Sequence, residues 1–249
     1  MNLHKNFKNN GYIYLPSYLH SNDYDNICDL FYSKVTKKLQ ETNLKKIGGY
    51  KIGNLNLNAG RDASKIWNLL IKHNLEKLIF EILGKNISDF TIRISGNINF
   101  PNKGAQHFHT DGKFKDKVYI LSIATEDINE KNGPTEIVED YHDIDLPYWK
   151  FCILKKRKKK IFMKKGDIFF RKHSLWHRGT INKSLNPRIL ISFLFFEKER
   201  NIQSNFNEND NIQIYNNFFE STLTGKIKEF IYVKFGFLFA LYKIIKSLN

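Results

Sequence analysis

The residues in this sequence best suited to chemistry are two histidines and one aspartate: His109, Asp111 and His177. His109 and Asp111 are two positions apart, so in an extended segment both side chains point to the same side and can reach one ion. Two imidazoles and one carboxylate on one face of an octahedral ion leave three positions open, as in non-haem iron(II) oxygenases. A 2-oxo acid can take two of these positions and O₂ the third. The pattern therefore favours an oxidation that uses Fe(II), a 2-oxo acid and O₂.

A second chemically informative residue is Arg188, which opens the apolar segment Ile189–Phe196. An arginine at the start of such a strand needs a partner, because deprotonation cannot remove its charge. A dicarboxylate cosubstrate such as 2-oxoglutarate would supply one through a two-pronged, charge-assisted contact. Ser192, four residues on, faces the same way. The alternative partner is an aspartate or glutamate in an ordinary ion pair.

Two other histidine patterns compete with this metal site. His107-Phe108-His109 could begin a cupin-type site, but such a site expects a glutamate a few residues later, and the first is Glu126. His173 and His177 could pair at i and i+4 on a helix. The apolar run Ile168–Phe170 instead predicts a strand that leads toward His177.

The elements that would position these residues change in character near residue 90. Residues 1–89 are predicted to be mostly helical, with one short strand at Tyr12–Leu15. A helix capped by Ser21, Asn22 or Asp23 is expected to run to about Leu39. A second helix is expected over Ser64–Leu83 and ends at Gly84.

Residues 90–197 consist of short apolar runs separated by turn signals, which predicts strands. The expected strands are Phe90–Phe100, Val118–Ala124, Glu136–Val138, Trp149–Leu154, Lys160–Met163, Asp167–Phe170 and Arg188–Phe196. Many short strands at this spacing indicate a mainly β fold with flanking helices, an antiparallel sandwich or barrel, for which the jelly roll is a common double-sheet solution. Residues 198–249 return to helix. No repeat or linker divides the chain, so residues 1–249 are predicted to form one domain.

The net charge of +15 comes mostly from lysine, since only 7 of the 40 basic residues are arginine. A chain that is also rich in Asn and Ile is typical of an AT-rich genome, so we interpret most of these lysines as solvated, and a nucleic-acid partner is not expected. The basic run at residues 155–160 is predicted to be a solvated hairpin tip. The alternatives are a contact with an anionic substrate or partner, and a localisation signal.

Cysteine usage and the chain ends bear on location. Cys28 and Cys152 have no zinc or disulfide spacing, and the first ten residues lack a signal peptide, so a reducing, cytoplasmic compartment is expected. Residues 230–245 are strongly apolar but shorter than a spanning helix needs. They are predicted to pack on the core or in a dimer contact, and peripheral membrane contact is the alternative.

Taken in order, five motifs resemble the phytanoyl-CoA dioxygenase family. Residues 10–16 resemble its opening G-Y-hydrophobic-x-L-P strand, and residues 109–112 match its H-x-D-G ligand pair. Residues 132–134 match its N-G-P turn, and residues 165–167 resemble the G-D before the distal histidine. Residues 177–188 fit its H-x₄-N-x-S-x₃-R ending. The most specific part of the resemblance is the combination of H-x-D with this ending.

The resemblance implies a double-stranded β-helix, here a cupin-like jelly roll flanked by helices. It further implies that His109, Asp111 and His177 hold Fe(II) and that Arg188 binds the distal carboxylate of 2-oxoglutarate. Gln106, three residues before His109, is a further candidate for the keto-acid end. Family halogenases carry Ala or Gly at the position of Asp111, so its presence favours hydroxylation.

The chain departs from the family at two places. Val138–His142 stands where the family usually has a P-G-S-H segment near the substrate, and Gly179 stands where some members have Ser. The hydroxyl of Thr180 is a candidate replacement for that Ser.

The function expected from these observations is hydroxylation of a C–H bond in a small, anionic metabolite, with release of succinate and CO₂. Two alternatives remain open: a hydroxylase that acts on a protein or nucleic acid, and a non-catalytic binding protein with the same fold.

Overall fold

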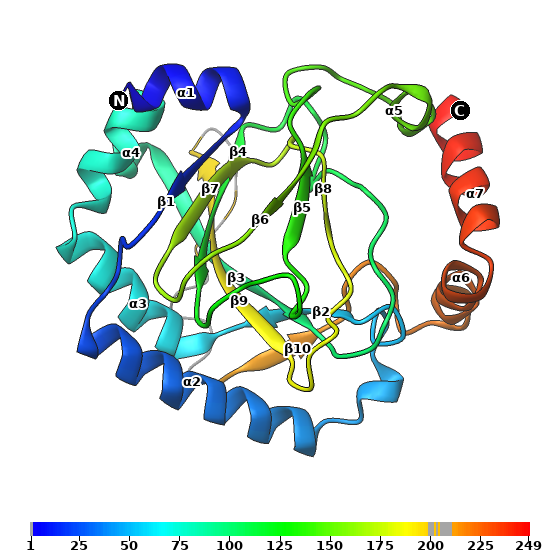
Figure 1. Cartoon of the computed structure of the whole chain (residues 1–249), viewed down its shortest axis with the longest axis horizontal. Coiled ribbons are helices and arrows are strands. Elements are labelled where there is room, and N and C mark those ends of the chain that lie inside the picture. The colour runs from blue at the N-terminus through cyan, green and yellow to red at the C-terminus, as the bar shows by residue number, and fades with distance from the viewer. Residues whose placement is uncertain (1, 199–201, 203, 205–210) are drawn as a thin grey trace.

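The computed structural model describes residues 2–198, 202, 204 and 211–249, which form two antiparallel sheets flanked by helices (Figure 1). The larger sheet has the spatial order β1 (Tyr12–Leu15), β7 (Ile168–Lys172), β4 (Val118–Ala124), β9 (Arg188–Glu197), β3 (Phe90–Asn99), β2 (Asn54–Asn58) and β10 (Gln213–Tyr215). The smaller sheet has the order β6 (Lys158–Ile161), β5 (Thr135–Val138) and β8 (His177–Gly179). The predicted fold, a mainly β jelly roll with flanking helices, is confirmed.

The centre of the larger sheet is the pair β3 and β9, whose register runs from Phe90↔Glu197 to Asn99↔Arg188. Side chains alternate between the two faces of a strand. On β9, Ile191 and Phe193 enter the core beneath the helices, whereas Ser192 and Leu194 line a cavity on the other face. One face of the sheet therefore stabilises the fold, and the other is available for chemistry.

The first helices cover the core face of this sheet and appear in blue to cyan in Figure 1: α1 (Leu3–Asn10), α2 (Asn22–Glu41), α3 (Gly60–Lys72) and α4 (Leu75–Leu83). Ser21 caps α2 by accepting from the amide of Tyr24, as predicted. Phe31 of α2 and Ile66 of α3 are fully buried in one cluster with Phe193 of the sheet. Short 3₁₀ turns lie at Leu44–Lys46 and Ile87–Asp89.

Two details of this helical part differ from the prediction. The expected single helix over residues 64–83 is two helices, because Asn74 adopts a left-handed conformation (φ 63°) that interrupts the helical path. Strand β2 was not expected; its Asn-Leu alternation buries Leu55 and Leu57 and turns Asn56 toward the cavity. Its period of two is the signal that could have identified it.

The expected strand over residues 149–154 is instead the helix α5 (Tyr148–Ile153). A short apolar run cannot be assigned by periodicity alone. The ring of Phe151 stacks on Trp176, with centroids 3.9 Å apart, and this packing favours the helix.

The basic run at residues 155–160 is not a hairpin tip, because it leads from α5 into β6. Arg157 pairs with Asp140 (Nη2–Oδ1 2.9 Å), Lys159 pairs with Glu139, and Lys160 pairs with Glu130. Three of the basic side chains in this run therefore form surface ion pairs.

The C-terminal part contains α6 (Leu223–Lys234) and α7 (Gly236–Leu248), in agreement with the helical prediction, and the unexpected short strand β10. Figure 1 places both helices on the side of the molecule opposite α1–α4. Among the described residues, no helix is both long and apolar enough to cross a membrane.

Asp167, in the predicted G-D motif, is 1% exposed and joins β1 to β7. Its carboxylate accepts from the Tyr14 hydroxyl (2.5 Å) and from the amides of Ser17 (2.7 Å) and Lys164 (2.6 Å). We expect Asp167→Ala to lower the free energy of unfolding by about 2–4 kcal/mol, because these buried donors lose a charged acceptor. Urea denaturation measures the loss. The exposed, ion-paired Asp143 provides the control, since Asp143→Ala should cost less than about 1 kcal/mol; equal losses would contradict the assignment.

Candidate active site

The candidate metal ligands are brought together by pairing between two backbone segments. His109 lies in the segment that links β3 to β4, and His177 lies on β8. The amide of His109 donates to the carbonyl of His177 (2.9 Å), and the reverse bond is 3.0 Å long. Asp111 continues the ladder by donating to the carbonyl of His173 (3.0 Å). This antiparallel pairing places the two imidazole rings side by side, with centroids 4.4 Å apart.

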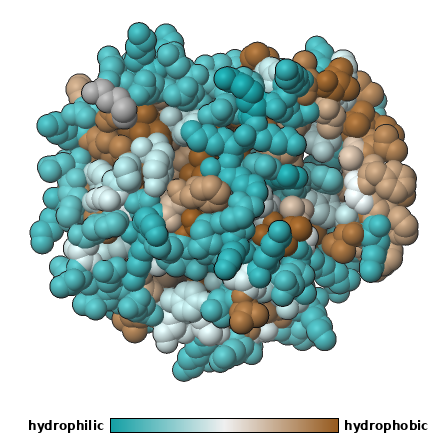
Figure 2. Space-filling model, in the orientation of Figure 1, coloured by the Kyte–Doolittle hydropathy of each residue, from teal (hydrophilic) through white to brown (hydrophobic). Residues whose placement is uncertain are grey.

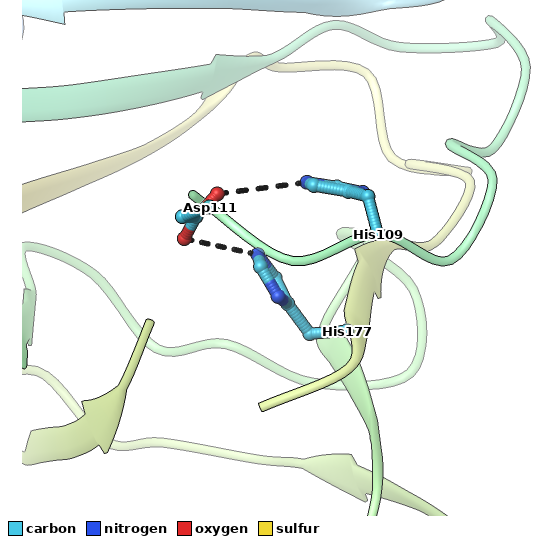
Figure 3. A group of neighbouring side chains, drawn as sticks. All are labelled: His109, Asp111 and His177. Carbon is cyan, nitrogen blue, oxygen red and sulfur yellow. Dashed lines mark ion pairs between the residues drawn. The ribbon is translucent and has the colours of Figure 1, made fainter. Parts of the chain in front are cut away.

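The side chains of the triad converge on one point (Figure 3). Asp111 Oδ1 lies 3.8 Å from His109 Nε2, and Asp111 Oδ2 lies 3.5 Å from His177 Nε2. One potential ligand atom from each residue lies within 4.8 Å of the others. The distances suit three donors around a single metal ion, and the donor set is that of a non-haem iron site.

Both histidines are oriented by their other ring nitrogen. His109 Nδ1 lies 2.9 Å from the carbonyl oxygen of His107, and His177 Nδ1 lies 3.0 Å from that of Leu175. A carbonyl only accepts, so each Nδ1 carries the proton and each Nε2 presents its lone pair to the centre. Both rings are thus held in the tautomer that can bind a metal.

A residue that the sequence analysis missed, Arg171 of β7, also enters this centre. Its Nη2 donates to Asp111 Oδ2 and lies 3.2 Å from His177 Nε2. The strand alternates, so Ile168 and Phe170 face the core while Phe169 and Arg171 face the cavity. A charge at a cavity-facing position of an otherwise apolar strand is the signal that could have identified it.

This arrangement controls the charge of the ligands. Burial by itself would raise the pKa of Asp111, but the Arg171 guanidinium, aided by His177 and His109, holds that pKa well below its usual range. Burial, reinforced by Arg171 and opposed by Asp111, lowers the pKa of His177 to about 3. At neutral pH the site therefore offers an ionised carboxylate and a neutral imidazole, the forms that bind a cation.

The triad opens onto a cavity of about 270 Å³ between the two sheets, and Arg188 lies in its wall. Arg188 is 1% exposed, and its Nε and Nη1 have no hydrogen-bond partner among the described residues. Burial lowers the pKa of Arg188 to about 10, with Glu126 opposing the shift. Ser192 lines the same cavity, as expected, and its hydroxyl lies 2.9 Å from that of Ser122.

The N-x-S part of the H-x₄-N-x-S-x₃-R motif positions this arginine. Asn182 is fully buried and donates to the carbonyls of Asn99 (2.9 Å) and Asn186 (2.8 Å). It also accepts from the amide and hydroxyl of Ser184. These bonds fix the loop between β8 and β9, so that Arg188 begins β9 facing the cavity.

Gln106 lies beside the triad, but its carbonyl end is engaged. Its Oε1 accepts from the amide of Gly179 (2.9 Å). A Cβ at position 179 would lie 3.0 Å from this Oε1 and 3.2 Å from Asn54 Oδ1, so Gly179 leaves room for Gln106. Thr180 does not replace the missing serine, because its hydroxyl donates to the carbonyl of Pro134 (2.7 Å) and it does not line the cavity.

The two competing histidine patterns do not form sites. The ring of His107 stacks on Phe239, with centroids 5.4 Å apart, rather than joining His109. His173 directs Nδ1 to the carbonyl of Val118 and Nε2 to that of Lys113, so both of its nitrogens are structural.

Comparisons with known proteins agree with this geometry. A family model described as phytanoyl-CoA dioxygenase (PhyH) matches residues 7–190. That range includes the triad, Arg171 and Arg188. A comparison with curated protein sequences gives no match.

Several solved structures share the fold. AviO1 from Streptomyces viridochromogenes Tue57 superposes with a TM-score of 0.61 at 14% identity, covering 81% of this chain and 96% of AviO1. The epimerase SnoN, in complex with Fe³⁺, alpha-ketoglutarate and nogalamycin RO, gives 0.59 at 13% identity, with 78% and 82% covered. HygX from Streptomyces hygroscopicus, with nickel and 2-oxoglutarate bound, gives 0.56 at 11% identity, with 79% and 86% covered. At these identities the likeness establishes the fold.

Arg171 donates to the same carboxylate that would bind a metal ion, so it should weaken metal binding. We expect Arg171→Met to tighten Co(II) binding without 2-oxoglutarate by about tenfold or more, because one positive charge leaves the centre. A competition titration against a chelating dye measures the affinity.

The control for this test is Arg178→Met, which removes the same charge one residue from His177. Arg178 lies on β8 but pairs with Glu136 (2.6 Å) outside the cavity, so its loss should leave the affinity nearly unchanged. Weaker Co(II) binding by Arg171→Met would instead mean that Arg171 is needed to hold Asp111 in place.

Proposed function

This chain belongs to the phytanoyl-CoA dioxygenase family, and on that premise we propose that it hydroxylates a C–H bond of a small, anionic metabolite. It is a 2-oxoglutarate-dependent non-haem iron oxygenase that uses Fe(II), 2-oxoglutarate and O₂. In the proposal, His109, Asp111 and His177 hold the iron, and Arg188 binds the distal carboxylate of 2-oxoglutarate. Gln106 is proposed to contact the keto-acid end through its amide group.

One observation carries these assignments: a buried guanidinium, two of whose nitrogens have no hydrogen-bond partner among the described residues, shares a cavity with the triad. A buried arginine without a full set of acceptors is costly, and a carboxylate provides acceptors in matching geometry. The polar wall of the cavity, with Ser122 and Ser192, suits the rest of such a ligand. The residues therefore fit a metal and a dicarboxylate together.

When bound, iron and 2-oxoglutarate supply the oxidising chemistry, which consumes O₂ and releases succinate and CO₂. The protein's own residues orient the reactants. The His107 and Leu175 carbonyls hold the two imidazoles, and Arg171 keeps Asp111 ionised. Apolar side chains of the cavity wall, such as Ile120 and Phe169, limit the entry of water.

The charge balance of the cavity supports an anionic substrate. Arg171 and Arg188 contribute two positive charges to the cavity wall, and Asp111 contributes one negative charge, while Glu126, which does not line the cavity, offsets part of the charge of Arg188. A divalent cation and a dianionic cosubstrate cancel each other. The loaded site would therefore keep part of one positive charge, which favours a negatively charged group on the substrate.

The alternative of a protein or nucleic-acid substrate gains little support from the basic run at residues 155–160, because Arg157, Lys159 and Lys160 pair with carboxylates of the same chain. We further propose that residues 1–249 form one oxygenase domain, because β1 and β10 join a single sheet. A cytoplasmic location stays a prediction.

The cosubstrate assignment is tested by adding Fe(II) and then 2-oxoglutarate to the protein without oxygen. A weak visible absorption band should appear only with both additions, since chelation by the 2-oxo acid requires a bound iron. Asp111→Ala should weaken or shift the band, because one proposed ligand of the iron is removed. Absence of the band in folded, iron-loaded wild-type protein would exclude this cosubstrate geometry.

The role of Arg188 is tested separately. We expect Arg188→Gln to weaken 2-oxoglutarate binding about 10- to 100-fold, because a charge-assisted contact is lost. Calorimetric titration of Ni(II)-loaded protein measures this affinity, and Arg178→Gln is the matched control. Unchanged affinity in folded Arg188→Gln protein would mean that another residue binds the carboxylate.

A further inference from the structure

The C-terminal helices expose an unusual number of large apolar side chains. We define the C-terminal apolar surface by the exposed apolar residues of α6, of α7 and of the junction between them: Leu223, Ile227, Phe230, Val233, Phe235, Phe237, Leu238, Leu241, Tyr242, Ile245 and Leu248. Phe237, Ile245 and Leu248 are at least 60% exposed. Figure 2 shows hydrophobic residues gathered along the margin at which Figure 1 places these helices. Exposed apolar patches of this extent mark sites of interaction.

The two helices turn their apolar stripes outward. In α7 the exposed Leu238, Leu241, Ile245 and Leu248 follow helical spacing, and Phe239 is the buried residue. A helix packed on a globular core would show the opposite orientation. Of the two arrangements predicted for residues 230–245, packing on the core is therefore wrong for most of their apolar side chains, and a dimer contact stays a prediction.

The two stripes form one continuous surface. The ring centroids of Phe230 on α6 and Phe235, which precedes α7, lie 6.2 Å apart. Lys228 Nζ lies 6.0 Å from the ring centre of Tyr242, across the two helices. A partner that covers this surface would contact both helices at once.

The charges around this surface have one sign. Lys226, Lys228, Lys234 and Lys246 are exposed on the two helices. The single acidic residue of positions 223–249 is Glu229, which is buried and accepts from the amides of Gly49 (3.0 Å) and Lys51 (2.8 Å). The exposed part of the surface therefore combines apolar side chains with lysines and has no opposing carboxylate.

We propose that the C-terminal apolar surface docks on the face of an anionic lipid bilayer, with α6 and α7 lying in the headgroup region. Apolar side chains flanked by lysines are typical of interfacial helices, and anionic headgroups attract the lysines. Neither helix is long enough to span, so they would lie in the plane of the membrane. A second copy of this chain fits less well, because face-to-face pairing would bring two sets of these lysines together on chains that each carry a net charge of +15.

The docked surface would lie close to the candidate active site. The ring of Phe239 in α7 lies 6.0 Å from that of Phe218, which lies 6.4 Å from that of His109. Lys243 Nζ is 4.4 Å from the centre of the Phe218 ring. One aromatic ring, that of Phe218, therefore lies between Phe239 of α7 and a proposed metal ligand, although docking itself does not depend on the proposed function.

The proposal is tested by flotation of the full chain with phosphatidylcholine vesicles, with and without phosphatidylglycerol. The protein should float with the anionic vesicles and be released by salt. The double substitution Leu241→Ser/Ile245→Ser should weaken this binding more than about tenfold, because two apolar side chains leave the interface. Leu185→Ser is the matched control, since Leu185 is 90% exposed on the loop between β8 and β9.

Charge is tested by Lys226→Glu/Lys246→Glu, which should also reduce vesicle binding more than about tenfold. Lys37→Glu/Lys38→Glu makes the same change in net charge on the exposed face of α2 and should reduce it much less. Equal losses in both pairs, or no flotation of folded wild-type protein, would overturn the proposal. A wild-type dimer in light scattering that Leu241→Ser/Ile245→Ser converts to a monomer would overturn it in favour of a second copy.

Discussion

The backbone pairing between His109 and His177 is the constraint on which the candidate active site depends. Two hydrogen bonds join a long connection between strands of the large sheet to the edge strand β8 of the small one. The next bond, from Asp111 to the carbonyl of His173, brings the carboxylate to the same point. Because the ligands come from paired strands, their spacing is set by sheet geometry, and no induced movement is needed to assemble them. The cavity between the sheets follows from the same pairing.

Within that cavity, buried charge decides what can bind. Arg171 donates to Asp111, and its guanidinium holds the pKa of that carboxyl well below its usual range, so Asp111 stays ionised. Among the described residues, the carboxylate that acts on the charge of Arg188 is Glu126, whose Oε1 accepts from the amide of Ile189. A low dielectric makes this inequality matter, because an incompletely paired guanidinium attracts an anion strongly. Arg171, at the metal end of the cavity, is thus paired with a carboxylate. Arg188, elsewhere in the cavity wall, has two nitrogens without a hydrogen-bond partner among the described residues.

Much of this could be predicted from the sequence because local patterns carry it. The strand at Val118–Ala124 and the cap at Ser21 depend on nearby residues, and both are as predicted. The triad and Arg188 were predicted from the combination of H-x-D with the H-x₄-N-x-S-x₃-R ending, and the structure places all four residues around one cavity. The role of Arg171 depends on the register of β7 between β1 and β4, which arises from distant parts of the chain. The helix α5 likewise depends on the stacking of Phe151 on Trp176.

The departure from the family pattern at Gly179 is explained by the close packing around this residue. A serine there would need space that Gln106 and Asn54 occupy, and the glycine amide instead donates to Gln106. The side chain of Gln106 is thereby held beside the triad by a backbone bond, and its backbone amide donates to the carbonyl of the same glycine (3.0 Å). In the proposed function, the polar contact near the keto-acid end would therefore come from Gln106, on the segment that carries His109 and Asp111, and not from position 179 of β8.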